Sequence, residues 1–422
     1  MNRDIIVVGG GLAGLASAYT LLKAGKKVTI IERESYLGGR VRTIDVKGRP
    51  VDFGGFIIYP WYREYHRLIK ELGVREKLER IPLHDVLYEL EDRVYTPFNK
   101  VKLPFTDTAK LWYTLGVPSL RVKLERPNLE TFGDETVSET VRAAIRDEYE
   151  GLYEKFIDIV AQGYCYAPVT QFRTAFMLPM MKETNVHGDI RSSFYFPNGN
   201  GIFIDALVKK ITALGAEIYL NTTLERVEGR TLHTSNGDFS ADHIVFAQQL
   251  ASEIASSINP ALAEGIAYTH FYSAVVEHAT DPQVNGNDHW GSVFYAPQKH
   301  MPYQVLTSIH LADLYHGALK NYILYNVKVD DALVDPCTML SQDGLFAQIS
   351  DQCAKLFPDA KPLRIVEMVN WKQLMPISTV EIVKKVRELQ GQNGYFFAGD
   401  YLGSPSMETA LRTGILAANA IK

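Results

Sequence analysis

The sequence predicts an α/β protein in which a domain built on a parallel sheet with ββα layers is interleaved with a domain made of a mixed β-sheet flanked by helices. Residues 5–32 predict this first, because they read as an apolar strand, a glycine-rich turn, a helix and a second strand. Residues 395–420 read as a further strand, turn and helix at the other end of the chain. Between them, residues 267–329 contain three runs rich in β-branched and aromatic residues, which predict strands of the mixed sheet.

Length and composition also indicate two domains. The chain has 422 residues with 46% hydrophobic content, and a single hydrophobic core stops growing at about 250–300 residues. Residues 134–185 are predicted to be helical and to wall the second domain, and Asn236-Gly237 is predicted as the tight turn of a hairpin in the first. The expected division is a discontinuous cofactor domain of residues 1–75, 198–268 and 375–422, and a substrate domain of residues 76–197 and 269–374.

The turn after the first strand carries the pattern of a dinucleotide-binding site. Gly9 permits a tight turn, Gly11 lets the backbone approach a pyrophosphate, and Gly14 lets the helix pack closely on the strand. The phosphates would then lie at a helix N-terminus, where free N–H groups favour an anion. Glu32 ends the second strand and is placed to accept hydrogen bonds from an adenosine ribose. A Rossmann-type domain is therefore predicted, with the neighbouring Leu12, Ala13 and Arg33 included in its site.

A second glycine element distinguishes FAD from NAD. Gly38-Gly39-Arg40 follows the ribose acid by a few residues, giving a second close backbone approach and a guanidinium aimed at a phosphate or flavin edge. With this element the chain resembles the flavin-containing amine oxidase and phytoene desaturase superfamily, in its desaturase-like or protoporphyrinogen-oxidase-like branch. The resemblance implies an FAD-binding domain of the Rossmann type.

The resemblance also implies roles for residues far from the first turn. Gly399-Asp400 would close the cofactor site, with Asp400 holding the ribityl-phosphate region and the backbone N–H of Met407, near the start of the last helix, pointing at the flavin carbonyl O2. A helix N-terminus there would stabilise an anionic reduced flavin. Members of the family usually have a histidine where this chain has Phe56, so no role of that histidine is carried over. The backbone of Leu224 would lie against the adenine, and Gly54, Gly55 and Phe56 would lie over the flavin.

Charge and cysteine content exclude several classes of function. The net charge is −5 with no long block of one sign, so nucleic acid is not an expected partner. Cys165, Cys337 and Cys353 are far apart and odd in number, which predicts neither a metal site nor a disulfide framework. The first strand starts within five residues of Met1, leaving no room for a signal peptide, and no apolar stretch reaches about 18 residues. We therefore expect a cytoplasmic protein; the sequence leaves its oligomeric state open.

The expected substrate class follows from departures from the amine oxidase pattern. Amine oxidases of this superfamily often have an aromatic cage residue just before the helix-opening methionine, and this chain has Ser406 there. They also have a lysine in a strand where this chain offers Ser273 or its neighbours. No cysteine lies in residues 371–385, which implies non-covalent FAD. The pocket beside the flavin is therefore predicted to be mainly aliphatic and aromatic, without a buried carboxylate to receive an ammonium.

The function predicted from these features is removal of hydride from a C–H bond of a largely apolar small molecule by FAD. Three alternatives remain: oxidation beside nitrogen, as in an amine oxidase or a porphyrinogen oxidase; an isomerase that uses reduced FAD without net redox change; and a cofactor-binding scaffold, which the intact glycine elements argue against. No catalytic side chain is identified, because the flavin takes the hydride and the scattered histidines favour structural roles. The electron acceptor, oxygen, quinone or another, is not predicted.

Residues 97–127 suggest a contact with a membrane. Six basic residues stand among aromatic and aliphatic ones there, with only Asp107 and Glu125 opposing them. A basic, aromatic-rich helical hairpin suits peripheral docking of an enzyme that draws a lipophilic substrate from a bilayer. The alternative is a lid of the substrate domain whose apolar face belongs to the core.

Overall fold

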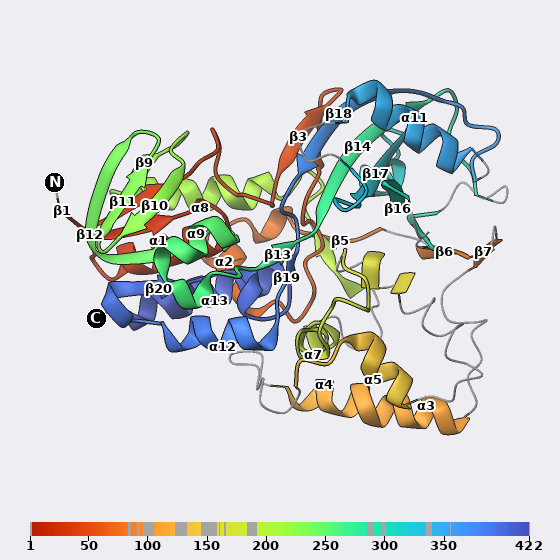
Figure 1. Cartoon of the computed structure of the whole chain (residues 1–422). Coiled ribbons are helices and arrows are strands. Elements are labelled where there is room, and N and C mark those ends of the chain that lie inside the picture. Colours follow the sequence, from red (N-terminus) through yellow and green to blue (C-terminus); the bar gives the residue numbers. More distant parts are fainter. Residues whose placement is uncertain are drawn as a thin grey trace.

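A computed structural model gives the arrangement of the two domains (Figure 1). The first domain, with both chain ends, lies at the left of the view, and the second sheet and a group of helices lie at the right. The structure describes residues 2–82, 86–90, 93–95, 105–122, 133–144, 158–159, 161–163, 166–183, 192–284, 290–296, 301–334, 340–354 and 356–421.

The first domain is built on a seven-stranded sheet assembled from distant parts of the chain. Its order is β10-β11-β12-β1-β2-β9, and β20 pairs with β12. The pairings β1–β2, β1–β12, β2–β9 and β12–β20 are parallel, whereas β10, β11 and β12 form an antiparallel meander. The strands are β1 (Asn2–Val8), β2 (Val28–Ile31), β9 (Glu217–Tyr219), β10 (Leu224–Glu228), β11 (Thr231–Thr234), β12 (Gly237–Phe246) and β20 (Tyr395–Phe397).

Helices from both ends of the chain pack together on this sheet. The first helix contacts the last one so closely that a Cβ on Gly414 would stand 2.2 Å from the carbonyl oxygen of Ala13. Ser17 Oγ donates to the Gly414 carbonyl oxygen at 2.9 Å. The helices of this domain are α1 (Leu12–Lys23), α2 (Arg63–Glu71), α8 (Gly201–Ala213), α9 (Ser252–Ile258), α12 (Val380–Glu388) and α13 (Met407–Ala420).

The second domain has a mixed seven-stranded sheet in the order β18-β14-β17-β16-β15-β6-β7. Only the pairing of β15 with β6 is parallel. Three of these strands match the three runs expected from the sequence, which confirms the predicted fold class. The strands are β6 (Val86–Leu90), β7 (Arg93–Tyr95), β14 (His270–His278), β15 (Ser292–Tyr295), β16 (Tyr303–His310), β17 (Tyr322–Val329) and β18 (Pro362–Trp371).

Helices flank this sheet, and short elements join the domains. The helices of the second domain are α3 (Phe105–Leu111), α4 (Val117–Arg121), α5 (Val137–Ala144), α7 (Thr174–Glu183), α10 (Leu311–Leu314) and α11 (Gln342–Cys353). Three two-stranded ribbons complete the fold: β3 (Thr43–Val46) with β4 (Arg49–Asp52), β5 (Glu79–Arg80) with β8 (Phe194–Tyr195), and β13 (Ala267–Tyr268) with β19 (Pro376–Ile377). Within the described residues, no helix is long and apolar enough to cross a membrane.

Two local predictions are wrong. The hairpin between β11 and β12 turns on Ser235 and Asn236, because Thr234 pairs with Gly237 and this glycine already begins β12. The predicted helical hairpin of residues 97–127 is instead a single helical run from Phe105 to Arg121, in which a π-helical turn, Trp112–Gly116, joins α3 to α4. Residues 97–104 and 123–127 of that stretch, and Cys165 and Cys337, lie outside the described residues.

Candidate functional site

A cavity of about 1140 Å³ lies between the two domains. One end is formed by the glycine turn after β1 and the tip of β2, and the other by the inner face of the second sheet. Most of the residues predicted for the cofactor site line this cavity; Gly14 and Gly399 do not. Those that do are Gly9, Gly11, Leu12, Ala13, Glu32, Arg33, Gly39, Arg40, Gly54, Gly55, Phe56, Leu224, Asp400 and Met407.

The backbone at the glycine turn has a conformation and a closeness of packing that only glycine permits. Gly9 has a φ of +104°, and a Cβ on it would stand 2.9 Å from the backbone of Ala247. A Cβ on Gly14 would stand 1.8 Å from the carbonyl oxygen of Gly9, so helix α1 could not approach the turn. Across the cavity wall, Gly11 faces Gly39, whose φ is +57°. These glycines open a backbone-lined cradle at the N-terminus of α1, as phosphate binding requires.

Glu32 is held in place by two backbone amides. Its Oε2 accepts from the Gly10 amide at 2.5 Å and its Oε1 from the Glu34 amide at 2.9 Å. The carboxylate is therefore fixed beside the glycine turn with only 8% of the residue exposed. The guanidinium of Arg42 lies 3.7 Å above the Tyr36 ring, and both residues line this end of the cavity although the sequence did not single them out.

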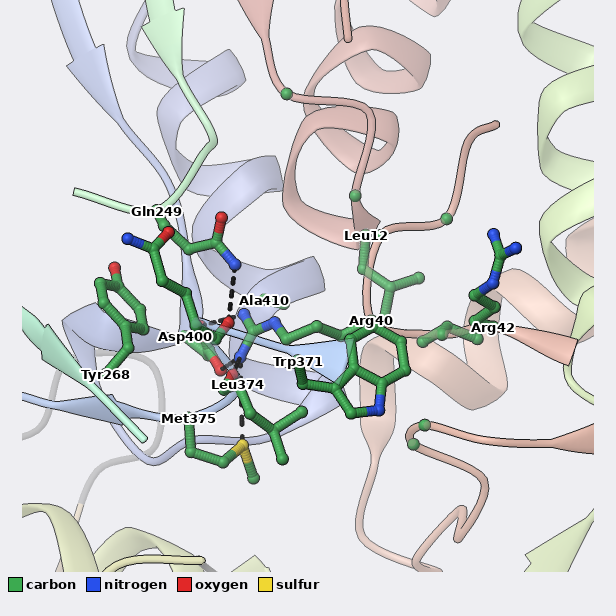
Figure 2. A pocket seen from close by; sticks show the side chains of 18 of the residues that line it. Leu12, Arg40, Arg42, Gln249, Tyr268, Trp371, Leu374, Met375, Asp400 and Ala410 are labelled. Atoms are coloured by element: carbon green, nitrogen blue, oxygen red, sulfur yellow. Dashed lines mark hydrogen bonds and ion pairs between the residues drawn. The ribbon is translucent and has the colours of Figure 1, made fainter. Parts of the chain in front are cut away.

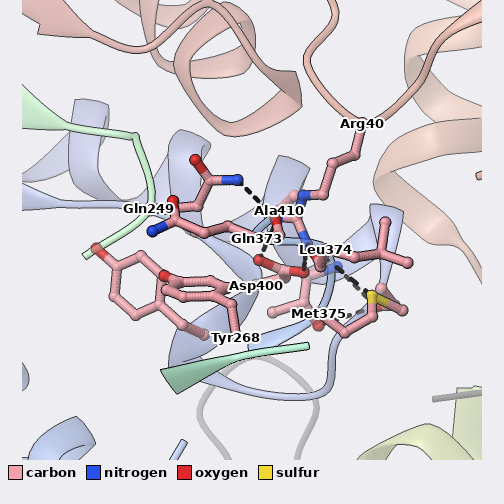
Figure 3. A network of polar contacts seen from close by, with 12 residues as sticks. Arg40, Gln249, Tyr268, Gln373, Leu374, Met375, Asp400 and Ala410 are labelled. Carbon is pink, nitrogen blue, oxygen red and sulfur yellow. Dashed lines mark hydrogen bonds and ion pairs between the residues drawn. The ribbon is translucent and has the colours of Figure 1, made fainter. Parts of the chain in front are cut away.

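Arg40 is directed to Asp400. Its two terminal nitrogens donate to the two carboxylate oxygens at 2.8 and 2.7 Å, and one of them also donates to the Leu374 carbonyl oxygen at 2.6 Å (Figures 2 and 3). The expected orientation toward a phosphate or flavin edge is not observed, because the buried carboxylate of Asp400 takes the bidentate face of the guanidinium. Both residues still line the cavity, and their contact with a cofactor stays a prediction.

The loop of Gly54, Gly55 and Phe56 passes between Arg40 and the start of the last helix. A Cβ on Gly54 would stand 1.8 Å from the Arg40 carbonyl oxygen, and one on Gly55 would stand 3.0 Å from the sulfur of Met407. The loop is therefore packed too closely for any side chain at the first of these positions. Phe56, which stands where the resembled families usually carry histidine, lines the cavity.

Asp52, which was not predicted as a site residue, supports this loop through Asn200. Its carboxylate oxygens each accept from the Asn200 amide at 3.0 Å, and one also accepts from Thr43 Oγ1 at 2.5 Å. Asn200 in turn donates its Nδ2 to the Gly55 carbonyl oxygen at 2.8 Å. Burial raises the pKa of Asp52 to about 7, partly offset by these hydrogen bonds.

The last helix begins at the cavity wall. Ser406 is its N-cap, with Oγ accepting from the Thr409 amide at 3.1 Å, and Met407 is its first residue. The positive end of the helix dipole thus lies where the resemblance places the flavin carbonyl. Glu408, in the first turn, sends its carboxylate to another helix: it accepts from the amides of Glu64 and Tyr65 at 2.9 and 3.0 Å and so caps α2.

The second sheet contributes a polar row, of which Ser273 and Asn326 line the cavity. Ser273, Asn326 and Thr307 lie directly opposite one another on β14, β17 and β16. Ser273 Oγ donates to Asn326 Oδ1 at 2.7 Å, and Asn326 Nδ2 donates to Thr307 Oγ1 at 2.9 Å. Trp371 Nε1 donates to Ser273 Oγ at 3.1 Å. Apolar residues that line the cavity include Val369 and Trp371 of β18 and, outside this sheet, Ile44, Phe53, Phe56, Ile57 and Tyr166.

One carboxylate in the cavity wall was not predicted from the sequence. Glu367 on β18 lines the same wall and is half-buried. The fully buried carboxylate of the cavity, Asp400, is neutralised by Arg40 and is not available to an ammonium. Glu367 could meet a substrate cation, and its place in a strand otherwise rich in apolar residues gave no signal in the sequence.

The residues present fit a bound flavin dinucleotide. The glycine cradle, the fixed Glu32 and the first residue of α13 line one cavity and could meet the pyrophosphate, the ribose and the flavin of such a cofactor. Gln248 Nε2 is buried in the cavity wall and, within the described part of the chain, finds no hydrogen-bond acceptor. Across the described ranges, no group of three or more His, Cys, Asp or Glu side chains gathers to hold a metal ion.

Known proteins resemble the chain in sequence and in fold. The profile of the family described as flavin containing amine oxidoreductase matches residues 12–422. Flavin-containing amine oxidase B of Mus musculus is 33% identical over 132 residues, which are 30% of this chain and 25% of that protein. The chain thus aligns with about a quarter of the length of this relative.

Solved structures share the fold over the whole chain. Cyclohexylamine oxidase from Brevibacterium oxydans IH-35A superposes with a TM-score of 0.73 and 17% identity, covering 100% of this chain and 99% of that one. A fatty acid isomerase from P. acnes that produces CLA superposes with a TM-score of 0.72 and 15% identity, covering 99% and 98%. At such identities the likeness concerns the fold alone.

Proposed function

The chain belongs to the flavin-containing amine oxidoreductase family, and we propose that it is an FAD-dependent oxidoreductase that removes hydride from a C–H bond of a largely apolar small molecule. The observation that carries the proposal is the wall of the cavity opposite the glycine turn. Aliphatic and aromatic side chains, among them Trp371, Tyr166 and Phe56, line the cavity together with the neutral polar pair of Ser273 and Asn326. Such a wall favours an uncharged, lipophilic substrate, because a charged group placed there would lose its hydration without a partner.

The cofactor half of the cavity would hold FAD without a covalent bond. The glycine cradle would receive the pyrophosphate, Glu32 the adenosine ribose, and the N-terminus of α13 the pyrimidine side of the flavin. When bound, the flavin supplies the two-electron acceptor of the reaction. The substrate would lose a hydride, which the flavin would accept, and a proton from the adjacent atom, which solvent water would accept; the two electrons would then pass to an external oxidant such as dioxygen or a quinone.

The protein itself would bind, orient and exclude water. Trp371, Tyr166 and Phe56 would hold the apolar body of the substrate, and the row of Ser273 and Asn326 would fix a neutral polar group if the substrate has one. Each of these two polar side chains is already hydrogen-bonded and at most 4% exposed, so the row is rigid before a ligand arrives. A rigid, dry wall positions a C–H bond without needing an acid or base from the protein.

Amine oxidation is the second candidate, and Glu367 favours it. This half-buried carboxylate lies on the same wall as Trp371, so a substrate ammonium could pair with the carboxylate while its carbon chain contacts the indole ring. The relatives named above include amine oxidases, which act on the substrate class of this alternative.

Anaerobic mixing distinguishes the candidates. Purified yellow protein is mixed with squalene or oleic acid in detergent, and separately with benzylamine or putrescine, and loss of the visible absorbance of the oxidised flavin is followed. The proposal expects bleaching by an apolar compound and none by the amines. Bleaching by the amines alone, abolished in Glu367→Gln and retained in Asn370→Asp as a variant of the same strand, would replace the proposal by amine oxidation. A change in an apolar compound that needs pre-reduced flavin and produces no net oxidation would instead indicate an isomerase.

A further inference from the structure

The helical run from Phe105 to Arg121, called here the outer helix, has apolar residues on two faces. One face is buried: Leu111, Leu115 and Ser119 are 7%, 5% and 0% exposed. This face packs against α5 and α7, which hold the helix on the molecule. This buried face alone supplies the apolar contacts by which the helix packs on the core.

The opposite face carries large apolar side chains that the protein leaves uncovered. Phe105 is 86% exposed, Tyr113 77%, Leu120 54% and Trp112 45%. Spacings of seven and eight residues place them on one side of the helix, over a length of about 22 Å. Of the nine large apolar residues that stand exposed in the described parts of the chain, these are four. Figure 1 shows the outer helix at the margin of the molecule, at the lower right.

Charge on and around the outer helix is opposite to that of the remaining chain. Lys110 and Arg121 are exposed beside the apolar face. In the sequence, residues 97–127 hold six basic and two acidic residues, a balance of +4, whereas the chain as a whole has −5. All other residues together therefore carry −9. An anionic surface would attract this segment and repel the rest of the protein, which fixes an orientation.

We propose that the outer helix docks the protein on the surface of an anionic lipid bilayer, with Phe105, Trp112 and Tyr113 at headgroup depth. Aromatic side chains favour the membrane interface, and basic residues beside them meet anionic headgroups. A second copy of the chain is a poorer occupant, because self-association through this face would bring two basic segments together. This surface lies outside the cavity, so docking through it does not depend on the reaction.

A hollow beside the helix adds a place for lipid. It has a volume of about 400 Å³ and is lined by Lys110, Tyr113, Ala143 and Ala144 among others. Its ammonium and small apolar side chains suit a phosphate headgroup above the end of an acyl chain. The hollow belongs to the outer helix and α5, and so would face the bilayer together with the exposed aromatic residues.

Vesicle sedimentation with the full-length, flavin-loaded protein tests the proposal. The probes are phosphatidylcholine vesicles with and without phosphatidylglycerol. We expect binding to the anionic vesicles, because each basic residue near the surface increases partitioning about fivefold. This binding should weaken as salt is added, because salt screens the attraction. The double variant Phe105→Ser and Tyr113→Ser should bind about tenfold or more weakly, because it removes the most exposed apolar groups.

The matched control is the double variant Leu214→Ser and Leu363→Ser, which removes exposed apolar residues of 45% and 52% exposure elsewhere on the surface. It should bind as the wild type does. Flavin absorbance and the melting temperature, measured for every variant, show that each one is folded. Wild-type protein that sediments with neither kind of vesicle, or equal losses in test and control variants, would overturn the proposal. The proposal would also be overturned if the wild type did not bind vesicles and light scattering showed a dimer that the Phe105 and Tyr113 substitutions dissociate. A second copy of the chain would then be the occupant.

Discussion

Replacing Arg40 by alanine should destabilise the protein even before the cofactor is considered. The guanidinium makes a bidentate pair with Asp400 and donates to the Leu374 carbonyl oxygen in the segment that leads back from the second domain. The side chain of Asp400 is 6% exposed and that of Arg40 is 28% exposed. Arg40→Ala would therefore leave a buried carboxylate without its counter-charge.

The size of the effect follows from this burial. Breaking a fully buried pair by removing one partner costs about 3–5 kcal/mol, whereas a surface pair is worth about 0–1 kcal/mol. The partial exposure of Arg40 lets water reach the site, so the lower value of about 3 kcal/mol applies. An unfolding entropy of about 2.1 cal/mol/K per residue gives about 0.9 kcal/mol/K for this chain, so Tm should fall by about 3 °C.

The assay is thermal unfolding of the flavin-free forms of the wild type, Arg40→Ala, Asp400→Ala and the double variant. The double variant should lose less stability than the two single losses combined, because neither charge is then left unpaired. Separately, FAD affinity should fall by about one to two decades if the guanidinium also touches the cofactor, as a charge-assisted bond of about 1.5–3 kcal/mol implies. An unchanged Tm for flavin-free Arg40→Ala, with additive losses in the cycle, would refute the structural argument.

Three further predictions concern the cofactor turn, the loop support and the polar row. Gly14→Ala should give folded but colourless protein, since its Cβ would stand 1.8 Å from the Gly9 carbonyl oxygen; yellow protein with FAD released by acid, as expected of the wild type, would contradict this. Asp52 has its pKa raised from 3.8 to about 7 by burial, so its contribution to stability is present below pH 3.8 and is lost as the pH rises through about 7. Asp52→Asn should therefore gain stability relative to the wild type between pH 5 and 8, by up to about 4 kcal/mol in urea unfolding; parallel pH profiles would exclude this titration. Asn326→Leu should cost about 1–3 kcal/mol because Ser273 Oγ loses its acceptor, while the flavin stays bound; loss of the flavin would show that the row also supports the cofactor.

The sequence alone was sufficient for the features that depend on neighbouring residues. A strand, a turn with glycine at fixed spacing and a helix constrain one another locally, so the turn of Gly9, Gly11 and Gly14 and the position of Glu32 could be predicted. Gly9, Gly11 and Glu32 line one end of the cavity, and Gly14 packs against the Gly9 carbonyl oxygen. The fold class and the family followed from this turn together with the Gly38-Gly39-Arg40 element and the strand, turn and helix at the other end of the chain. The turn of the β11–β12 hairpin was misplaced by one residue, since Gly237 with its positive φ is compatible with either position.

Partners that are distant in the chain could not be predicted from local pattern. Arg40 and Asp400 are 360 residues apart, and only the folded arrangement shows that the guanidinium meets a carboxylate instead of pointing freely at the cofactor. The row of Ser273, Asn326 and Thr307 exists because the register of three strands aligns these residues; a shift by one residue would turn each to the other face of the sheet. Spacing within a segment determined the cofactor turn, whereas pairing between segments determined the wall that a substrate would meet, because register and burial arise only when distant strands and helices pack.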